Sequence, residues 1–280
     1  MEISASGWAW AQRCMSTFLL ALCGLGLVTA LGGCASPSEN APGGPKVDIV
    51  TESDEPDGRR RARIRLELAI GYFEQGQTTV ALDELKQSIA ADPNFAPAYN
   101  LRGLIYMRLS DPVLAEDSFR RALTLNPRDA DVFHNYGWML CQQSRFADAQ
   151  KAFSQAIAVP LYGGRAKSWM AQGLCQMKAG QTAEAELSFQ RSYELDAGNP
   201  VTGYNLANLL FLRGDIVRAQ FYVRRLNNSD LANSESLWLG IKVERRLDNR
   251  DAMQQLGAQL KKRFAQSREL VAFERSAFDE

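Results

Sequence analysis

The sequence has few of the side chains that most enzymes use for catalysis. Histidine occurs once in the 280 residues, at position 134, so no cluster of histidines can hold a metal ion. The chain has no Gly-x-Ser-x-Gly segment and no glycine-rich phosphate-binding loop. Carboxylate pairs such as Glu184 and Glu186 fall on a polar helix face, where water surrounds them. These absences predict that the protein is not an enzyme and needs no metal, cofactor or small-molecule substrate.

Net charge is also missing. The 32 lysines and arginines balance the 32 aspartates and glutamates, which gives no electrostatic reason to expect nucleic acid as a partner. The densest basic run is formed by the five arginines between Arg59 and Arg65. This run starts a predicted helix, where positive charge opposes the helix dipole, so we expect that end to fray. The alternative is contact with acidic lipid or wall polymer.

Cysteine is scarce, and three of the five cysteines lie in the first 34 residues. Residues 15–31, MSTFLLALCGLGLVTAL, form an uncharged apolar run that follows Arg13 and precedes two glycines. This order is typical of a secretory signal, and the run is short for a membrane-spanning helix, which needs about 20 apolar residues. The alternatives are an ordinary signal peptide or a short membrane anchor with an incidental cysteine.

The end of the apolar run, Leu31-Gly32-Gly33-Cys34, resembles the bacterial lipobox. The resemblance implies that residues 1–33 are a lipoprotein signal peptide and that Cys34 is acylated. Ala35, rather than Asp, follows the cysteine, which favours the outer membrane in Gram-negative lipoproteins. Residues 34–58 contain four prolines and three glycines with no apolar period, so they are predicted to form a flexible linker on the periplasmic side.

The remainder of the chain is an internal repeat. Small residues recur in pairs twelve apart, and successive pairs are 34, 34, 36, 34 and 33 residues apart. The pairs are Ala69/Ala81, Gly103/Ala115, Gly137/Ala149, Gly173/Ala185, Ala207/Ala219 and Gly240/Ala252. A large apolar residue follows each pair after one helical turn: Leu85, Phe119, Phe153, Phe189, Val223 and Leu256. Turn residues divide each unit in its middle, so each unit is predicted to be two short helices that cross closely at the small pair.

This pattern resembles the tetratricopeptide repeat (TPR), a family of helix-turn-helix repeats with a 34-residue period. The resemblance is most complete in the second and third units, with Tyr99, Tyr106 and Pro127 at the family's positions. The implied fold is all-α, a right-handed superhelical solenoid of six repeats over residues 59–265. Residues 266–280 are predicted to be a C-terminal tail or cap.

The family's geometry implies which side chains line the concave face of such a solenoid. These positions lie three before, one after and four after the first small residue of each repeat, and most of them are apolar. A groove of this kind suits an extended or helical peptide with apolar anchors. It lacks the basic pair of the TPR clamps that capture acidic chain ends. The alternative is that some of these residues pack between repeats. The predicted groove residues are Leu66, Ile70, Phe73, Asn100, Leu104, His134, Trp138, Met170, Leu174, Tyr204 and Asn208.

Only Cys141 and Cys175 remain in the repeats, within the first helices of the third and fourth units. Cys175 stands two residues earlier in its unit than Cys141 does, an offset that allows the two side chains to face each other. A disulfide needs Cα atoms within about 7 Å. We favour a bridge across the two-residue insertion near Pro160–Gly164, and the alternative is a pair of small buried hydrophobes.

A lipid anchor, a linker and six TPR units together resemble the type IV pilus pilotin family, PilF/PilW. The resemblance implies an outer-membrane lipoprotein, monomeric and facing the periplasm. It would bind the secretin subunit of the pilus machinery and promote its localisation and multimerisation. One alternative is a TPR lipoprotein that recruits peptidoglycan hydrolases or outer-membrane assembly factors. The other is an enzyme or a regulatory subunit of one.

Overall fold

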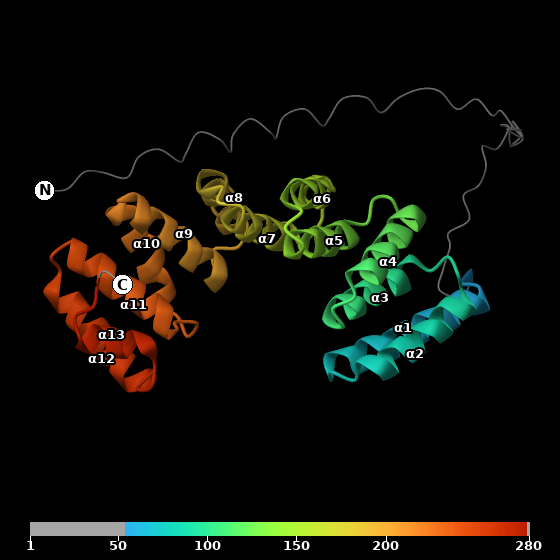
Figure 1. The fold of residues 1–280 in the computed structure, drawn as a ribbon, viewed down its shortest axis with the longest axis horizontal. Coiled ribbons are helices and arrows are strands. Elements are labelled where there is room, and N and C mark those ends of the chain that lie inside the picture. Colours follow the sequence, from blue (N-terminus) through green and yellow to red (C-terminus); the bar gives the residue numbers. More distant parts are fainter. Residues whose placement is uncertain (1–53, 279–280) are drawn as a thin grey trace, which may run out of the picture. The chain divides into compact units, whose positions relative to one another are not determined.

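The computed structural model describes residues 54–278, where it contains thirteen α-helices and no strand (Figure 1). The predicted signal peptide, Cys34 and most of the predicted linker lie outside these residues. The first helix begins at Asp57, two residues before the predicted start of the array. The helices are α1 (Asp57–Glu74), α2 (Thr78–Ala91), α3 (Ala96–Arg108), α4 (Pro112–Leu125), α5 (Ala130–Gln142), α6 (Phe146–Ala158), α7 (Arg165–Lys178), α8 (Thr182–Leu195), α9 (Pro200–Arg213), α10 (Ile216–Asn227), α11 (Ser234–Arg246), α12 (Arg250–Arg263) and α13 (Arg268–Glu274).

Helices α1 to α12 form six consecutive pairs, one for each predicted repeat (Figure 1). The second small residue is fully buried in the first five pairs, and the large apolar residue after it is buried in the same core. Ala252 of the sixth pair is only half-buried and Gln259 is exposed, so this pair is packed less tightly than the others. The repeating all-α solenoid predicted from the small-residue spacing is therefore confirmed.

In the first five pairs, the size of the large residue matches the space left by the small residue that faces it. Where a glycine is present, a phenylalanine ring covers it: a methyl group on Gly103 would lie 2.6 Å from Phe119, and one on Gly173 would lie 2.8 Å from Phe189. Where Ala69 takes that position, the facing residue is the smaller Leu85. The cores of the pairs are thus filled by complementary volumes, as close packing requires.

The turn inside each pair contains one residue in the left-handed region of backbone space. Glycine supplies it at Gly76, Gly180 and Gly214, with φ of 77°, 75° and 87°. The other three turns use Ser110, Ser144 and Asp248, with φ of 58°, 60° and 51°. The left-handed residue ends the first helix and reverses the chain, which is the usual way to terminate a helix.

The arginine-rich start of α1 is a regular helix, and four of its five arginines are paired with carboxylates. Arg65 donates to Glu84 at 2.8 Å, and Arg63 donates to Glu55 at 3.1 Å. Arg59 is paired with Asp92. Most of the positive charges that we expected to loosen this helix end are therefore balanced by carboxylates.

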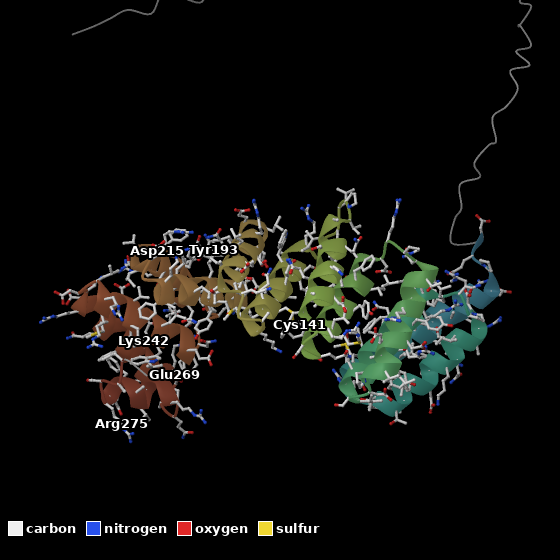
Figure 2. The ribbon with its side chains drawn as sticks, turned by 45° about the horizontal axis from the view of Figure 1, so that its top comes forward. Cys141, Tyr193, Asp215, Lys242, Glu269 and Arg275 are labelled. Carbon is white, nitrogen blue, oxygen red and sulfur yellow. A yellow bond between two sulfur atoms is a disulfide. The ribbon has the colours of Figure 1, made fainter. Side chains whose placement is uncertain are left out.

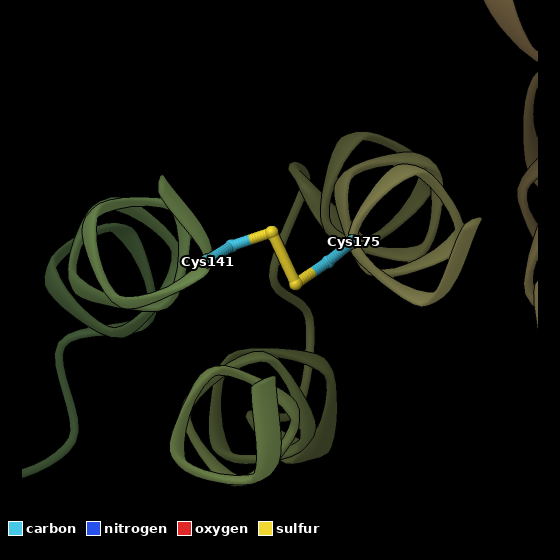
Figure 3. Close-up of a disulfide and its surroundings, with 2 residues drawn as sticks. All are labelled: Cys141 and Cys175. Carbon is cyan, nitrogen blue, oxygen red and sulfur yellow. A yellow bond between two sulfur atoms is a disulfide. The ribbon is translucent and has the colours of Figure 1, made fainter. Parts of the chain in front are cut away.

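A disulfide joins Cys141 on α5 to Cys175 on α7, with the two Cα atoms 5.8 Å apart (Figure 3). Both cysteines are buried. The bridge links the first helices of the third and fourth pairs across the two-residue insertion. Within the insertion, the ring of Tyr162 covers Gly164 so closely that a methyl group there would lie 2.4 Å from it.

The short helix α13 packs against α11 and α12 at the end of the stack. Trp238 of α11 stacks on Phe278 with ring centroids 5.4 Å apart and meets Phe273 edge-on at 6.5 Å. These rings cover the apolar face that the last pair would otherwise present to solvent.

Candidate functional site

The first helix of each pair lies on the inner side of the stack. Direct contacts join α1 to α3, α3 to α5, α5 to α7 and α9 to α11, in addition to the contacts within each pair. We call α1, α3, α5, α7, α9 and α11 the inner helices, and their shared surface away from the second helices the inner face. We call the second helices of the pairs the outer helices: α2, α4, α6, α8, α10 and α12.

Nine of the eleven predicted groove residues keep part of their surface accessible. Ile70 is exposed, and the others are half-buried: Phe73, Asn100, Leu104, Trp138, Met170, Leu174, Tyr204 and Asn208. Several of them rest on the core, so their outer side remains open while their inner side is packed. The structure thus leaves a row of partly open apolar and amide side chains along the inner helices.

The prediction is wrong for Leu66 and His134, which are only 8% and 6% exposed. Leu66 packs into one core with Ala98 and Ile105 of the next pair. Both residues stand three before the first small residue of their repeat, and each packs against the inner helix of the following repeat. They stabilise the junctions between repeats and leave little surface for a partner.

His134 is held at such a junction by a polar contact. Its Nδ1 lies 2.9 Å from the hydroxyl oxygen of Ser168 on α7. Burial lowers the pKa of His134 from 6.5 to about 4, and the positive charge of Lys167 contributes in the same direction. The imidazole is therefore neutral at physiological pH and serves the packing of α5 on α7.

The amides of the row differ in what they can offer a partner. Asn135 donates to the side-chain oxygen of Asn100 at 3.1 Å, so that oxygen is already engaged between repeats. Asn208 has no hydrogen bond to another side chain or to the backbone within the described part of the chain, and its amide is free to meet a peptide group.

The sequence-based view of this face missed its cations. The guanidinium of Arg108 lies 3.9 Å from the ring centre of Phe73 and donates to the Phe73 carbonyl at 2.7 Å. The ammonium of Lys178 lies 5.5 Å from the Trp138 ring. Each cation comes from a helix 35 or 40 residues further along the chain, so no local pattern in the sequence could place it on the aromatic ring.

A third cation lies where the fifth and sixth pairs meet. The ammonium of Lys242, labelled in Figure 2, is 5.8 Å from the Phe211 ring and 5.7 Å from the Trp238 ring. Arg246 of the same helix lies 5.5 Å from the Phe211 ring. The inner face thus combines aromatic rings with positive charge, an arrangement suited to binding.

Two further properties of the described residues concern metal ions and membranes. Within residues 54–278, no group of three or more histidine, cysteine, aspartate and glutamate side chains could hold a metal ion. Over the same described range, none of the helices combines the length and apolar character that crossing a bilayer requires.

Comparison with known proteins agrees with this architecture. One tetratricopeptide-repeat family model matches residues 66–130 and 140–200, and a second matches residues 118–151. The type IV pilus assembly protein PilF of Pseudomonas aeruginosa is 28% identical over 249 residues, an alignment that covers 89% of this chain and 95% of PilF.

Two solved structures extend the similarity to the fold. The structure of P. aeruginosa PilF has a TM-score of 0.70 at 29% identity and covers 78% of this chain and 99% of PilF. The structure of PilW, described as a widely conserved type IV pilus biogenesis factor, has a TM-score of 0.66 at 29% identity. It covers 76% of this chain and 97% of PilW.

The fold and the inner face define the class of protein: a right-handed superhelix of tetratricopeptide repeats, a class that mediates contacts between proteins. Within this class, the chain belongs to the PilF/PilW-like family of tetratricopeptide-repeat proteins.

Proposed function

We propose that this chain acts in type IV pilus biogenesis as a pilotin. It binds the secretin subunit along its inner face and promotes the localisation and multimerisation of the secretin in the outer membrane. The observation that carries the proposal is the similarity to PilF, which extends over 95% of PilF in sequence and 99% of it in the solved structure. The half-buried apolar residues of the inner helices support it, because they provide anchors for a polypeptide.

Membrane residence follows in this proposal from acylation of Cys34. A single acyl chain binds a bilayer only weakly, whereas two or three form a stable anchor. Residues 34–58 then tether the array to the periplasmic side of the outer membrane. Confinement to the membrane raises the local concentration of the array near the secretin, so a modest affinity suffices.

The anchor is tested by Cys34→Ser in the full chain. We expect the variant to accumulate and keep its helical content but to leave the outer-membrane fraction and to reduce secretin multimers. Membrane fractionation and gel electrophoresis of the secretin measure both effects. Normal multimers at normal protein levels would contradict this part of the proposal.

The inner face is tested by Phe73→Ala and Trp138→Ala in a pull-down of the secretin. We expect each variant to reduce capture of the secretin at least tenfold, because a large buried anchor at an interface contributes about 2 kcal/mol or more. Phe221→Ala is the matched control, since Phe221 is 60% exposed on the outer helix α10. Equal capture by all three variants would exclude the inner face as the binding surface.

A further inference from the structure

In the middle of the repeat array, from α3 to α9, the inner helices hold an excess of positive charge although the chain as a whole is neutral. The inner helices α3, α5, α7 and α9 carry six basic residues and one acidic residue, Asp131. The outer helices α4, α6 and α8 carry six acidic and four basic residues. The single acid of the inner set accepts a hydrogen bond from Tyr162 at 3.0 Å. The inner side therefore attracts negative charge.

Three cations beside aromatic rings of the inner helices have no carboxylate partner within the described residues, and neither has Arg246 beside the Phe211 ring. The three are Arg108, Lys178 and Lys242, which lie against the rings of Phe73, Trp138 and Phe211. Other basic side chains of the array are paired, such as Arg145 with Glu116 at 2.8 Å and Arg213 with Glu186 at 2.8 Å. On the inner face, cations without a carboxylate partner therefore lie beside partly open aromatic rings.

Lys242 is the most informative of the three because it stands at a packing position. Its place, two residues after the first small residue, is taken by buried apolar residues in the four preceding repeats: Ile105, Met139, Cys175 and Leu209. Lys242 is half-buried, and burial lowers its pKa. A positive charge that is partly withdrawn from water without a counter-ion is unfavourable, and an arriving carboxylate would remove that cost.

The spacing of the cations favours several carboxylates over one. Arg108, Lys178 and Lys242 lie on α3, α7 and α11, that is, on every second inner helix. Packed helices are about 8–10 Å apart, so two steps cover about 16–20 Å. An extended chain covers that span in about five or six residues. One terminal carboxylate reaches a single cation, whereas acidic side chains along a segment reach all three.

We propose that the inner face binds an acidic segment of a partner polypeptide. Apolar side chains of the segment contact Phe73, Trp138 and Phe211, and its Asp or Glu side chains meet Arg108, Lys178 and Lys242. This inference specifies the kind of segment that the face takes, and it rests on the proposed function only in assigning that segment to the secretin. Charge complementarity supplies the selection, and the aromatic rings supply the contact area.

The test uses the full chain, purified in detergent, on an array of random 12-residue peptides with acetylated and amidated ends. We expect the bound peptides to be enriched at least threefold in Asp and Glu, with acidic residues recurring five or six positions apart. The tightest peptide is then titrated by fluorescence anisotropy. Raising the salt from 0.05 to 0.5 M should weaken its binding more than tenfold, because mobile ions screen charge pairs.

Variants assign the effect to the inner face. Lys178→Gln and Lys242→Gln should each weaken binding about tenfold, since a charge-assisted hydrogen bond is roughly twice as strong as a neutral one. Lys151→Gln is the control: it removes the same charge from an exposed position on the outer helix α6 and should change binding less than twofold. Circular dichroism checks that all three variants keep their helical content.

The inference is overturned if no peptide binds, if the bound peptides show no enrichment in acidic residues, or if Lys242→Gln behaves like Lys151→Gln. It is also overturned if binding requires a free carboxyl end on the peptide. Acidic selection together with failure to capture the secretin would instead disprove the proposed partner and leave the inference standing. Capture of the secretin without enrichment of acidic peptides would overturn the inference and leave the proposed partner standing.

Discussion

At the scale of single residues, the junction inside each helix pair depends on a match of volumes. Gly103 and Phe119 form one such match. Ala69 and Leu85 form another, in which the small residue is larger and the large residue is smaller. The sixth pair departs from this rule, because Gly240 faces Leu256 and the remaining space is filled by Asn227 from the preceding pair. The last pair is packed less tightly because a side chain from the preceding pair fills part of its core.

This match predicts the outcome of a double-mutant cycle. Gly103→Ala should lower the free energy of unfolding by about 1–3 kcal/mol, because the added methyl group overlaps the Phe119 ring. Adding Phe119→Leu should recover part of that loss, since it recreates the combination found in the first pair. Urea unfolding followed by circular dichroism measures each step. Gly71→Ala is the control, as nothing lies within 4 Å of its added carbon. Equal losses at positions 71 and 103, or no recovery in the double variant, would contradict the match.

His134 predicts a pH dependence of stability. Its pKa is about 4 in the folded chain and about 6.5 in the unfolded chain, so the unfolded state binds the proton more readily. The stability that neutral His134 contributes is complete above pH 6.5 and is lost as the pH falls towards 4. Between pH 7.5 and pH 5.0 we expect a loss of about 2 kcal/mol from this group.

The measurement compares urea unfolding of the wild type and of His134→Gln at both pH values. The carboxylates titrate alike in the two proteins, so the difference between them isolates the histidine. A decrease of the same size in both would show that His134 is not the cause.

The sequence was sufficient to predict burial at positions whose neighbours lie one or two helical turns away or in the paired helix. The small pairs and the large residue after them recur at a fixed spacing, so their burial could be predicted. The positions of the cations on the inner face could not be predicted. Lys178 meets Trp138 across 40 residues, and no regular spacing in the sequence relates the two. Leu66 and His134 were misplaced for a related reason: their burial depends on how the next repeat docks, which a single repeat does not specify.

At the scale of helices, the disulfide joins two positions that hold apolar residues at the two neighbouring junctions of the array. Cys175 stands two after its first small residue, and Cys141 stands four after its own. The same two positions hold Met139 and Met107 at one neighbouring junction and Leu209 and Met177 at the other. The bridge thus replaces an apolar contact with a covalent one, where the insertion lengthens the connection between repeats.

Removal of the bridge should destabilise the middle of the array. For a sequence separation of 34 residues, the loop-entropy relation corresponds to about 3–4 kcal/mol. We expect a reductant to lower the urea midpoint of the wild type and to leave Cys141→Ala/Cys175→Ala unchanged. Identical unfolding of the wild type with and without reductant would contradict a stabilising role.

At the scale of the molecule, the described array is a one-dimensional stack whose ends must be covered. The stability of such a stack is approximately a sum of repeat and junction contributions. At the carboxyl end, α13 and the rings of Phe273 and Phe278 cover Trp238. The sixth pair therefore depends on this cover more than the inner pairs do.

Truncation after Phe264 tests this dependence. We expect α11 and α12 to lose hydrogen-exchange protection at least tenfold while α3 to α8 keep theirs, because each pair contacts only its neighbours. Mass spectrometry of the exchanged peptides distinguishes the two regions. Uniform loss along the whole array would show that it unfolds as one cooperative unit.

The disulfide also makes a closed ring of the backbone between Cys141 and Cys175, and Leu161, which is fully exposed, lies on that ring. A protease that cuts beside Leu161 would open the ring without releasing either half of the protein. The severed chain would keep both halves in register, and it would separate into two fragments only when a reductant breaks the sulfur bond.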